Sequence, residues 1–177
     1  HYRNLVIPAE EWPILKWASG EVMEENIVCK AIDYTGKNVV VTGAAQGAGA
    51  GIATRFAQAG ANVAITYHRN QDAAAAKVAE LTSMGVKAEA FCMDQREVDT
   101  IGGVMDSIVR SFGGIDVIVN NAGIYPHQNN LDMTCEEWDD MQSSSTRGVF
   151  FVCQAAAKVM KEQQNGGAII NVSSINA

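Results

Sequence analysis

Short apolar runs alternate with helix-like stretches from Lys37 to the end of the chain. The apolar runs predict five strands, at 38–42, 61–67, 86–92, 115–119 and 168–172. The stretches between them predict helices near 48–59, 71–84, 96–112, 135–142 and 146–164. Apolar strands that alternate with helices of this length are typical of right-handed βαβ units, which form a parallel sheet with both faces covered.

The turn after the first predicted strand is rich in glycine. Residues 42–49 read Thr-Gly-Ala-Ala-Gln-Gly-Ala-Gly and lead into a predicted helix. Gly43 permits a tight turn, Gly47 allows the backbone to approach a pyrophosphate, and Gly49 allows the helix to pack close to the strand. The helix N-terminus then offers N–H groups to the phosphates. Such a turn can also be a plain connection, but its place between a strand and a helix favours a dinucleotide site.

The composition narrows the class of protein. The chain has 177 residues, a formal charge of −7 and 47% hydrophobic residues, which suits one soluble α/β domain. The negative charge argues against nucleic acid or an anionic membrane as a partner, and no apolar run is long enough to span a bilayer. The four cysteines lack the spacing of a metal site, so we expect no bound metal and reduced thiols in the cytoplasm.

Further motifs stand at the ends of the later strands. Asn120-Asn121-Ala122-Gly123 follows the fourth strand, Asp94 follows the third, and Asn171-Val172-Ser173-Ser174 ends the fifth. With the Gly-x-x-x-Gly-x-Gly spacing after Thr42, this order of motifs resembles the short-chain dehydrogenase/reductase family over residues 36–177. The resemblance implies an α/β fold, a Rossmann-type doubly wound parallel sheet with strand order 3-2-1-4-5 in the part present. Residues 1–35 lie outside it and are expected to form an N-terminal arm; a partly ordered leader is the alternative.

The resemblance also implies roles for single residues. Asp94 would accept a hydrogen bond from the adenine amino group. Ser174 would hold the oxygen atom of the substrate, and the alternative for this hydroxyl is a cap on the strand end. Asn121, Ala122 and Gly123 would line the adenosine ribose and brace the sheet. The expected cofactor contacts are Gly43, Gln46, Gly47, Ala48, Gly49, Tyr67, His68, Arg69, Asp94, Gln95, Asn121, Ala122 and Gly123.

The cofactor preference depends on the end of the second strand. Enzymes that use NAD usually carry an acidic residue there, which binds the ribose 2′-hydroxyl and repels a 2′-phosphate. This chain has Tyr67, His68 and Arg69 instead. Arginine can pair with a phosphate through two hydrogen bonds, so NADP(H) is favoured over NAD(H). Gln46 is neutral where many NADP-preferring relatives carry Arg or Lys, and the alternative for His68 and Arg69 is that they are solvated loop residues.

Two of the catalytic elements that the family uses differ in this sequence. The family uses a Tyr-x-x-x-Lys motif, in which the tyrosine donates a proton and the lysine lowers the pKa of the tyrosine. The motif is expected in the helix after Ser174, whereas the sequence runs three residues further and none of its four tyrosines precedes a lysine at that spacing. We therefore expect a domain that is incomplete at its C-terminus. The usual helical Asn, which supports a water of the proton relay, falls on Ser145.

Three functions remain open at this point. The first is an NADP(H)-dependent oxidoreductase that moves hydride between the nicotinamide and a small-molecule carbonyl or alcohol, as a homodimer or homotetramer through the helix at 146–164. The second is a catalytically inactive relative that binds a dinucleotide. The third is another doubly wound protein, such as a flavodoxin-like domain or a methyltransferase, which the combined motifs disfavour. Tyr125, Pro126 and His127 follow the Asn-Ala-Gly motif and are candidates for one wall of the substrate pocket.

Overall fold

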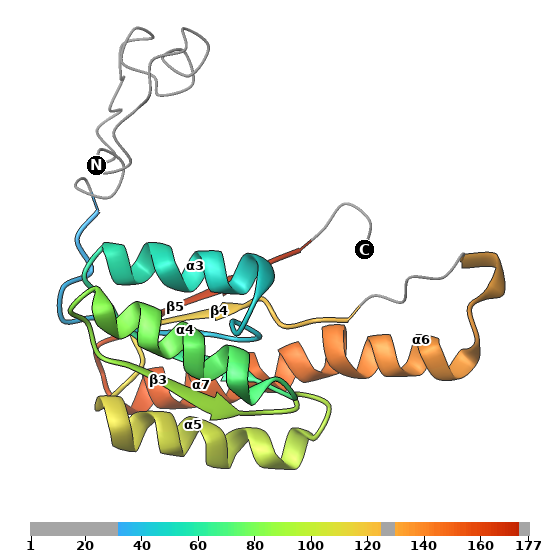
Figure 1. Ribbon diagram of the computed structural model, residues 1–177. Coiled ribbons are helices and arrows are strands. Elements are labelled where there is room, and N and C mark those ends of the chain that lie inside the picture. Colours follow the sequence, from blue (N-terminus) through green and yellow to red (C-terminus); the bar gives the residue numbers. More distant parts are fainter. Residues whose placement is uncertain (1–31, 125–129, 174–177) are drawn as a thin grey trace, which may run out of the picture. The chain divides into compact units, whose positions relative to one another are not determined.

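A parallel sheet of five strands lies at the centre of the domain. The computed structural model describes residues 32–124 and 130–173. Its sheet has the strand order β3-β2-β1-β4-β5, which confirms the predicted order (Figure 1). The strands are β1 (Asn38–Val41), β2 (Asn62–Tyr67), β3 (Ala88–Cys92), β4 (Val117–Asn120) and β5 (Ala168–Asn171).

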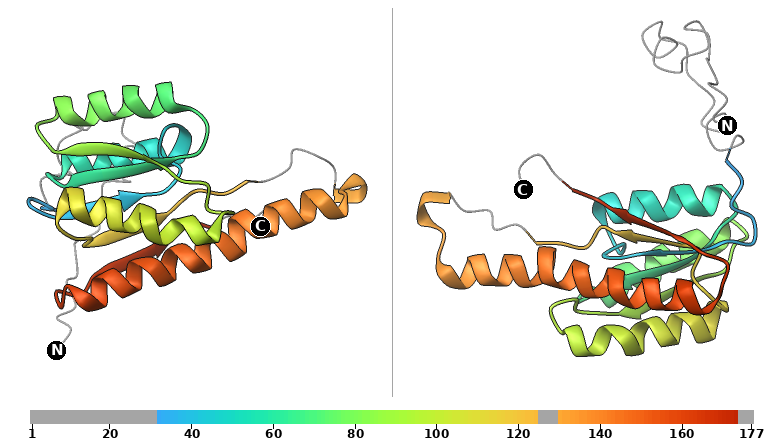
Figure 2. Two further views of the ribbon diagram at one scale, coloured as in Figure 1. Left: turned by 90° about the horizontal axis from the view of Figure 1, so that it is seen from below. Right: turned by 180° about the vertical axis from the view of Figure 1, so that it is seen from behind.

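The helices that pack on the sheet form two layers, one on each face. α3 and α4 cover one face, and α5 and α7 cover the other (Figures 1 and 2). The helical segments are α3 (Gly47–Gln58), α4 (Gln71–Ser83), α5 (Val98–Phe112), η2 (Asn130–Asp132), α6 (Cys135–Gln142), η3 (Ser143–Gly148) and α7 (Val149–Glu162). Within residues 32–124 and 130–173, no helix has the length and apolar character that a membrane span requires.

The central strand β1 supplies side chains to both hydrophobic layers. Val39 and Val41 pack in one cluster with Ala53 of α3 and Leu81 of α4. Val40 points to the opposite face and belongs to the cluster that α5 and α7 cover. All three valines are buried. Because successive side chains of a strand point to opposite faces, a shift of one residue would reverse both layers, and the register is therefore fixed.

This register places the carboxyl ends of the inner strands at one edge of the sheet. Val41 of β1 pairs with Ile65 of β2 and with Val119 of β4, and Ile65 pairs with Ala90 of β3. The chain changes direction across the sheet between β1 and β4, which are neighbours although they are not consecutive. Ligands of open α/β sheets bind outside the carboxyl ends of the strands at such a point.

The sequence predicted two separate helices at 135–142 and 146–164, but the structure joins them. A π-helical segment, η3, connects α6 to α7 in one continuous stretch (Figures 1 and 2). Residues 143–146, Ser-Ser-Ser-Thr, contain no proline or glycine that would stop a helix. The stretch runs close to the end of β3, since a Cβ atom on Gly148 would lie 2.6 Å from the carbonyl oxygen of Gln95. π-helical turns of this kind often occur at functional sites.

The outer strand β5 is exposed along its whole length. Ile170 is 43% exposed and Val172, just beyond the strand, is 47% exposed. Both side chains are apolar, so in the described residues this edge of the sheet is less well covered than the edge formed by β3.

Candidate functional site

The turn between β1 and α3 has the backbone conformation that its glycines predict. Gly43 and Gly47 both lie in the left-handed region, with φ of +63° and +62°. A Cβ atom on Gly43 would also lie 2.9 Å from Cα and Cβ of Ala122, so this position has no room for a side chain. Nothing lies within 4 Å of the place where a Cβ on Gly47 would stand, so the space beside Gly47 is open to a ligand.

Gly49 brings the first turn of α3 against the loop that follows β4. A Cβ atom here would collide with the side-chain nitrogen of Asn121 and would lie 2.7 Å from the carbonyl oxygen of Gly43. Gln46 at the N-cap makes no capping hydrogen bond, and the first turn carries no acidic residue. The helix therefore begins without a side chain that satisfies its first N–H groups. Such a helix start favours the binding of a phosphate.

Thr42 and Asn121 lock the ends of β1 and β4 together. The Thr42 hydroxyl oxygen accepts hydrogen bonds from the backbone nitrogens of Asn121 and Ala122, both at 3.0 Å. In return, the Asn121 side-chain amide donates to the carbonyl oxygens of Thr42, at 3.0 Å, and Gly43, at 3.3 Å. Thr42 is completely buried. These hydrogen bonds of Thr42 and Asn121 hold the two strand ends in place, and the role of Thr42 was not predicted.

The end of β2 contributes two basic side chains to the same edge. Thr66 accepts a hydrogen bond from the backbone nitrogen of Gly43 at 3.2 Å and ties β2 to the glycine turn. Residues 66–70, Thr-Tyr-His-Arg-Asn, contain no carboxylate. His68 and Arg69 are exposed. The segment is therefore cationic where an NAD-binding site usually carries an acid.

Asp94 lies after β3 and is paired with two basic side chains. Nε of Arg96 is 3.0 and 3.1 Å from its two carboxylate oxygens, and Nη2 of Arg96 is 2.7 Å from Oδ2. Nε2 of His68 is 3.2 Å from the same Oδ2. The hydrogen bonds from Arg96 hold the pKa of Asp94 below its usual range, although partial burial acts in the opposite direction. Asp94 is thus an ionised acceptor at neutral pH.

Gln95 connects the end of β3 with two other segments. Its side-chain amide nitrogen donates to the carbonyl oxygens of Ala122, at 2.9 Å, and Ser144, at 2.8 Å. Gln95 and Ser144 are both buried. These two hydrogen bonds use both amide protons, so the Gln95 side chain holds the loop after β4 and η3 in place.

Ser145 both accepts from and donates to Ile124, in the loop that follows β4. Its hydroxyl accepts a hydrogen bond from the backbone nitrogen of Ile124 at 3.3 Å and donates one to the carbonyl oxygen of Ile124 at 3.2 Å. η3 is therefore attached to the segment after the Asn-Ala-Gly motif. Ser174, Tyr125, Pro126 and His127 lie outside the described residues.

These segments enclose a cavity of about 450 Å³ at the carboxyl edge of the sheet. Ten predicted cofactor contacts line it. They are Gly43, Gln46, Tyr67, His68, Arg69, Asp94, Gln95, Asn121, Ala122 and Gly123. The other three, Gly47, Ala48 and Gly49, form the start of α3 and do not line the cavity itself.

Several cavity residues were not predicted from the sequence. Arg96 and Asp140 are the charged ones, and Thr66, Asn70 and Ser144 are polar. Arg96 could have been found as a basic residue two positions after Asp94. No sequence pattern points to Asp140, because only the tertiary fold brings α6 close to this cavity.

A sequence model of the short-chain dehydrogenase family matches residues 37–177. The chain belongs to this family. It is 36% identical to the 2-dehydro-3-deoxy-D-gluconate 5-dehydrogenase of Escherichia coli over 84% of this chain and 58% of that protein. It is 38% identical to a 3-oxoacyl-[acyl-carrier-protein] reductase of Staphylococcus aureus over 78% of this chain and 56% of that protein. The chain thus spans little more than half the length of these curated relatives.

A solved structure gives the same result for the fold. A short-chain dehydrogenase from Burkholderia cenocepacia, crystallised in complex with NADP, matches with a TM-score of 0.73 and 34% identity, over 80% of this chain and 57% of that chain. The parallel sheet with its helices on both faces is therefore the fold of this family.

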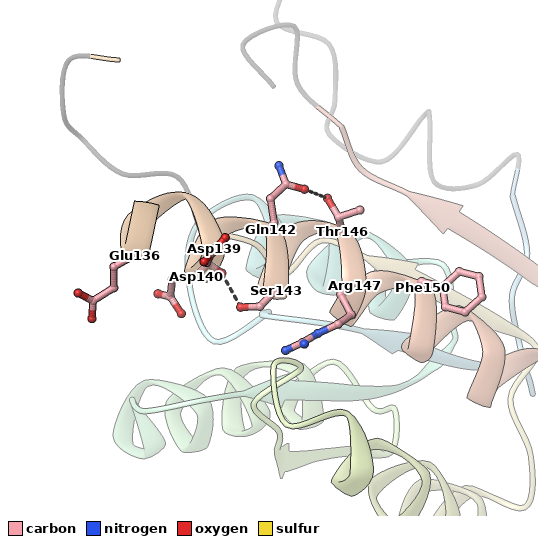
Figure 3. Close-up of a pocket in the computed structure, with 8 residues that line it drawn as sticks. All are labelled: Glu136, Asp139, Asp140, Gln142, Ser143, Thr146, Arg147 and Phe150. Atoms are coloured by element: carbon pink, nitrogen blue, oxygen red, sulfur yellow. Dashed lines mark hydrogen bonds between the residues drawn. The ribbon is translucent and has the colours of Figure 1, made fainter. Parts of the chain in front are cut away.

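A second cavity lies along α6, η3 and α7. Figure 3 shows the side chains that line it along the continuous helical stretch, from Glu136 to Phe150. Its volume is about 1080 Å³. Asp140 borders both this cavity and the one at the sheet edge. Within residues 32–124 and 130–173, no cluster of His, Cys, Asp or Glu side chains is suited to hold a metal ion.

Proposed function

We propose that this chain binds NADP(H) in the cavity at the carboxyl edge of the sheet. The observation that carries the proposal is the convergence of four strand ends on one cavity of about 450 Å³, beside a helix that begins without a side-chain cap. The left-handed Gly47, with nothing within 4 Å of the place where a side chain would stand, gives that helix start an open approach for a pyrophosphate. The residues present therefore fit a dinucleotide.

The preference for NADP(H) over NAD(H) rests on the end of β2. His68 and Arg69 face the cavity, and residues 66–70 carry no acid that would repel a 2′-phosphate. The carboxylate that contacts this segment in the described residues, Asp94, is itself paired with Arg96. The related Burkholderia cenocepacia protein was crystallised with NADP, which agrees with this choice.

We propose that the reaction is hydride transfer between the nicotinamide and a small-molecule carbonyl or alcohol. The bound dinucleotide supplies or accepts the hydride. The chain's own residues position it, and Ser174 would hold the substrate oxygen by a hydrogen bond. Ser145 holds Ile124, directly after the Asn-Ala-Gly motif, by two hydrogen bonds. The curated relatives act on a sugar acid and on an acyl carrier protein conjugate by their names, so they do not define one substrate.

The organisation of the whole protein is part of the same proposal. Residues 1–35 would form an arm, and residues 36–177 the NAD(P)-binding domain, of which the family model matches 37–177. The protein would work in the cytoplasm as a homodimer or homotetramer that forms through α7. Its described cysteines, Cys92, Cys135 and Cys153, are free thiols, which suits a reducing compartment.

Fluorescence titration with NADPH and NADH tests the cofactor proposal. NADPH should bind more tightly than NADH. Arg69→Gln should lower the affinity for NADPH by about three- to tenfold, because one charge-assisted contact to a phosphate is lost. The affinity for NADH should stay unchanged. Arg110→Gln on α5 is the matched control, since Arg110 pairs with Ser107 and does not line the cavity. Absence of saturable binding with both nucleotides would refute the proposal.

A dinucleotide-binding protein without turnover is the second candidate. Ser145 occupies the position of the family's usual Asn, and the 177 residues contain no Tyr-x-x-x-Lys. The two candidates differ in one readout, the oxidation of NADPH in the presence of a panel of small aldehydes and ketones. Tight NADPH binding with no carbonyl-dependent oxidation would favour the binding protein for this chain.

A further inference from the structure

Arg96 presents three N–H groups to the carboxylate of Asp94. Its backbone nitrogen donates to Oδ1 at 3.0 Å, its Nε is shared between both oxygens, and its Nη2 donates to Oδ2 at 2.7 Å. An ionised carboxylate offers about four lone-pair positions. The three donors come from one residue, so the carboxylate plane is fixed relative to the backbone after β3, and little acceptor capacity remains.

The remaining acceptor position is on the side of the cavity. Nε2 of His68 lies 3.2 Å from Oδ2 of Asp94, while Nη2 of Arg96 keeps its own hydrogen bond to the same oxygen. His68 is exposed and follows the end of β2, so it can move away from Asp94 more easily than the partly buried Arg96. A ligand amino group that seeks this carboxylate therefore has one position to take, which is that of His68.

A second carboxylate holds Arg96 from the other end of its guanidinium. Nη1 of Arg96 donates to Oδ1 of Asp140 at 2.6 Å. Asp140 belongs to α6, a helix that has no buried residue of its own. The guanidinium is thus fixed between Asp94 and Asp140, and all three side chains line the same cavity. Both carboxylates raise the pKa of Arg96 further, so its charge is permanent.

We propose that Arg96 is a positioning residue that makes the base subsite selective for adenine. It fixes Asp94 so that one lone pair of Oδ2 faces a base that carries an exocyclic amino group. Hypoxanthine has a carbonyl oxygen in place of that amino group, and this oxygen would face the carboxylate without a proton between them. The inference rests on the proposed dinucleotide function and adds to it the residue that sets base specificity.

The test compares NADPH with its hypoxanthine counterpart, reduced nicotinamide hypoxanthine dinucleotide phosphate. Dissociation constants of both are measured by fluorescence on the 177-residue chain, and their ratio is the readout. The wild-type chain should prefer adenine by about tenfold or more, the value of one charge-assisted hydrogen bond. Arg96→Met should reduce the preference to about threefold or less, because an unfixed carboxylate loses its preorganisation.

Two further variants keep the test informative if Arg96→Met does not fold. Arg96→Lys keeps the charge but cannot make the forked contact, so it should also lose most of the preference. Asp140→Asn leaves Arg96 and Asp94 in place and should reduce the preference only partly. Arg110→Met, the same replacement at a distant exposed arginine, should leave the ratio unchanged.

Each remaining outcome contradicts a defined step. An unchanged ratio in both Arg96→Met and Arg96→Lys would mean that Arg96 only anchors α6. A ratio that rises would mean that Arg96 competes with the base for Asp94. Equal affinity of the wild-type chain for both nucleotides would show that Asp94 does not read the base. Failure of the wild-type chain to bind either nucleotide would instead refute the proposed function.

Discussion

Single buried residues hold the walls of the cavity together through hydrogen bonds. Thr42 is the example: one buried hydroxyl oxygen accepts from two consecutive backbone nitrogens, those of Asn121 and Ala122. Valine has the same shape as threonine but cannot accept a hydrogen bond. Thr42→Val therefore leaves two N–H groups without their acceptor, and we expect a loss of about 2 to 4 kcal/mol in the free energy of unfolding. Urea denaturation measures it. Thr100→Val, at an exposed position on α5, should cost much less, and equal losses would contradict the argument.

Asp116 is a second residue for which we predict an effect, here on how the stability of the fold depends on pH. Burial raises the pKa of this carboxyl, but the backbone N–H of Asn38 at 2.8 Å and Nζ of Lys37 at 2.9 Å more than offset it, and the net pKa is lowered. A lowered folded pKa stabilises the protein above the unfolded pKa, and this stability is lost as the pH falls below about 4. The midpoint temperature of thermal unfolding should therefore fall less between pH 6 and pH 3 in Asp116→Asn than in the wild-type chain. The exposed Asp106→Asn is the control, and a full acid sensitivity in Asp116→Asn would refute the assignment.

At the scale of elements, α3 provides a matched pair of glycines. A methyl group at Gly49 would collide with the Asn121 amide and the Gly43 carbonyl, whereas nothing lies within 4 Å of a methyl group at Gly51. Gly49→Ala should lower the free energy of unfolding by about 1 to 3 kcal/mol through overpacking, and it should also weaken the binding of NADPH. Gly51→Ala should gain about 0.5 to 1 kcal/mol, because alanine favours the helix. Chemical denaturation of both variants gives the comparison. Similar effects at the two sites would mean that α3 is not in close contact with the loop after β4.

The elements themselves could be predicted from the sequence, because each has a local signal. The apolar runs of the strands and the glycines at Gly43 and Gly49 act within a few residues of where they stand. The joint between α6 and α7 could not be predicted. Ser143 to Thr146 suit a loop as well as a helix, and what decides is the tertiary contact of Ser144 with the buried Gln95. The same limit applies to Ser145, whose partner Ile124 lies 21 residues earlier.

At the scale of the whole molecule, the topology predicts where the candidate site lies. It does not predict the network of charged side chains in that site. Strand ends that meet at one edge brought Gly43, Asp94 and Asn121 together as the order of motifs implied. The link from Asp94 through Arg96 to Asp140 crosses from β3 to α6, which are 44 residues apart at the Arg96–Asp140 contact. No periodicity or motif encodes such a contact, because it depends on how a helix packs after the sheet has formed.

Association of copies is the property that the molecule's surface predicts. Phe150 on α7 is 61% exposed and Trp138 on α6 is 51% exposed, and burial of large apolar side chains in a contact between copies is favourable. Sedimentation should find the wild-type chain as a dimer or larger. Phe150→Lys should shift it towards the monomer, because a charged side chain is costly to bury in an apolar contact. Thr82→Lys on α4 adds the same charge at an exposed position and should leave the association unchanged. Phe150 does not line the cavity at the sheet edge, so NADPH affinity should be the same in both variants. A Phe150→Lys chain that sediments like the wild type would show that the contact surface lies elsewhere.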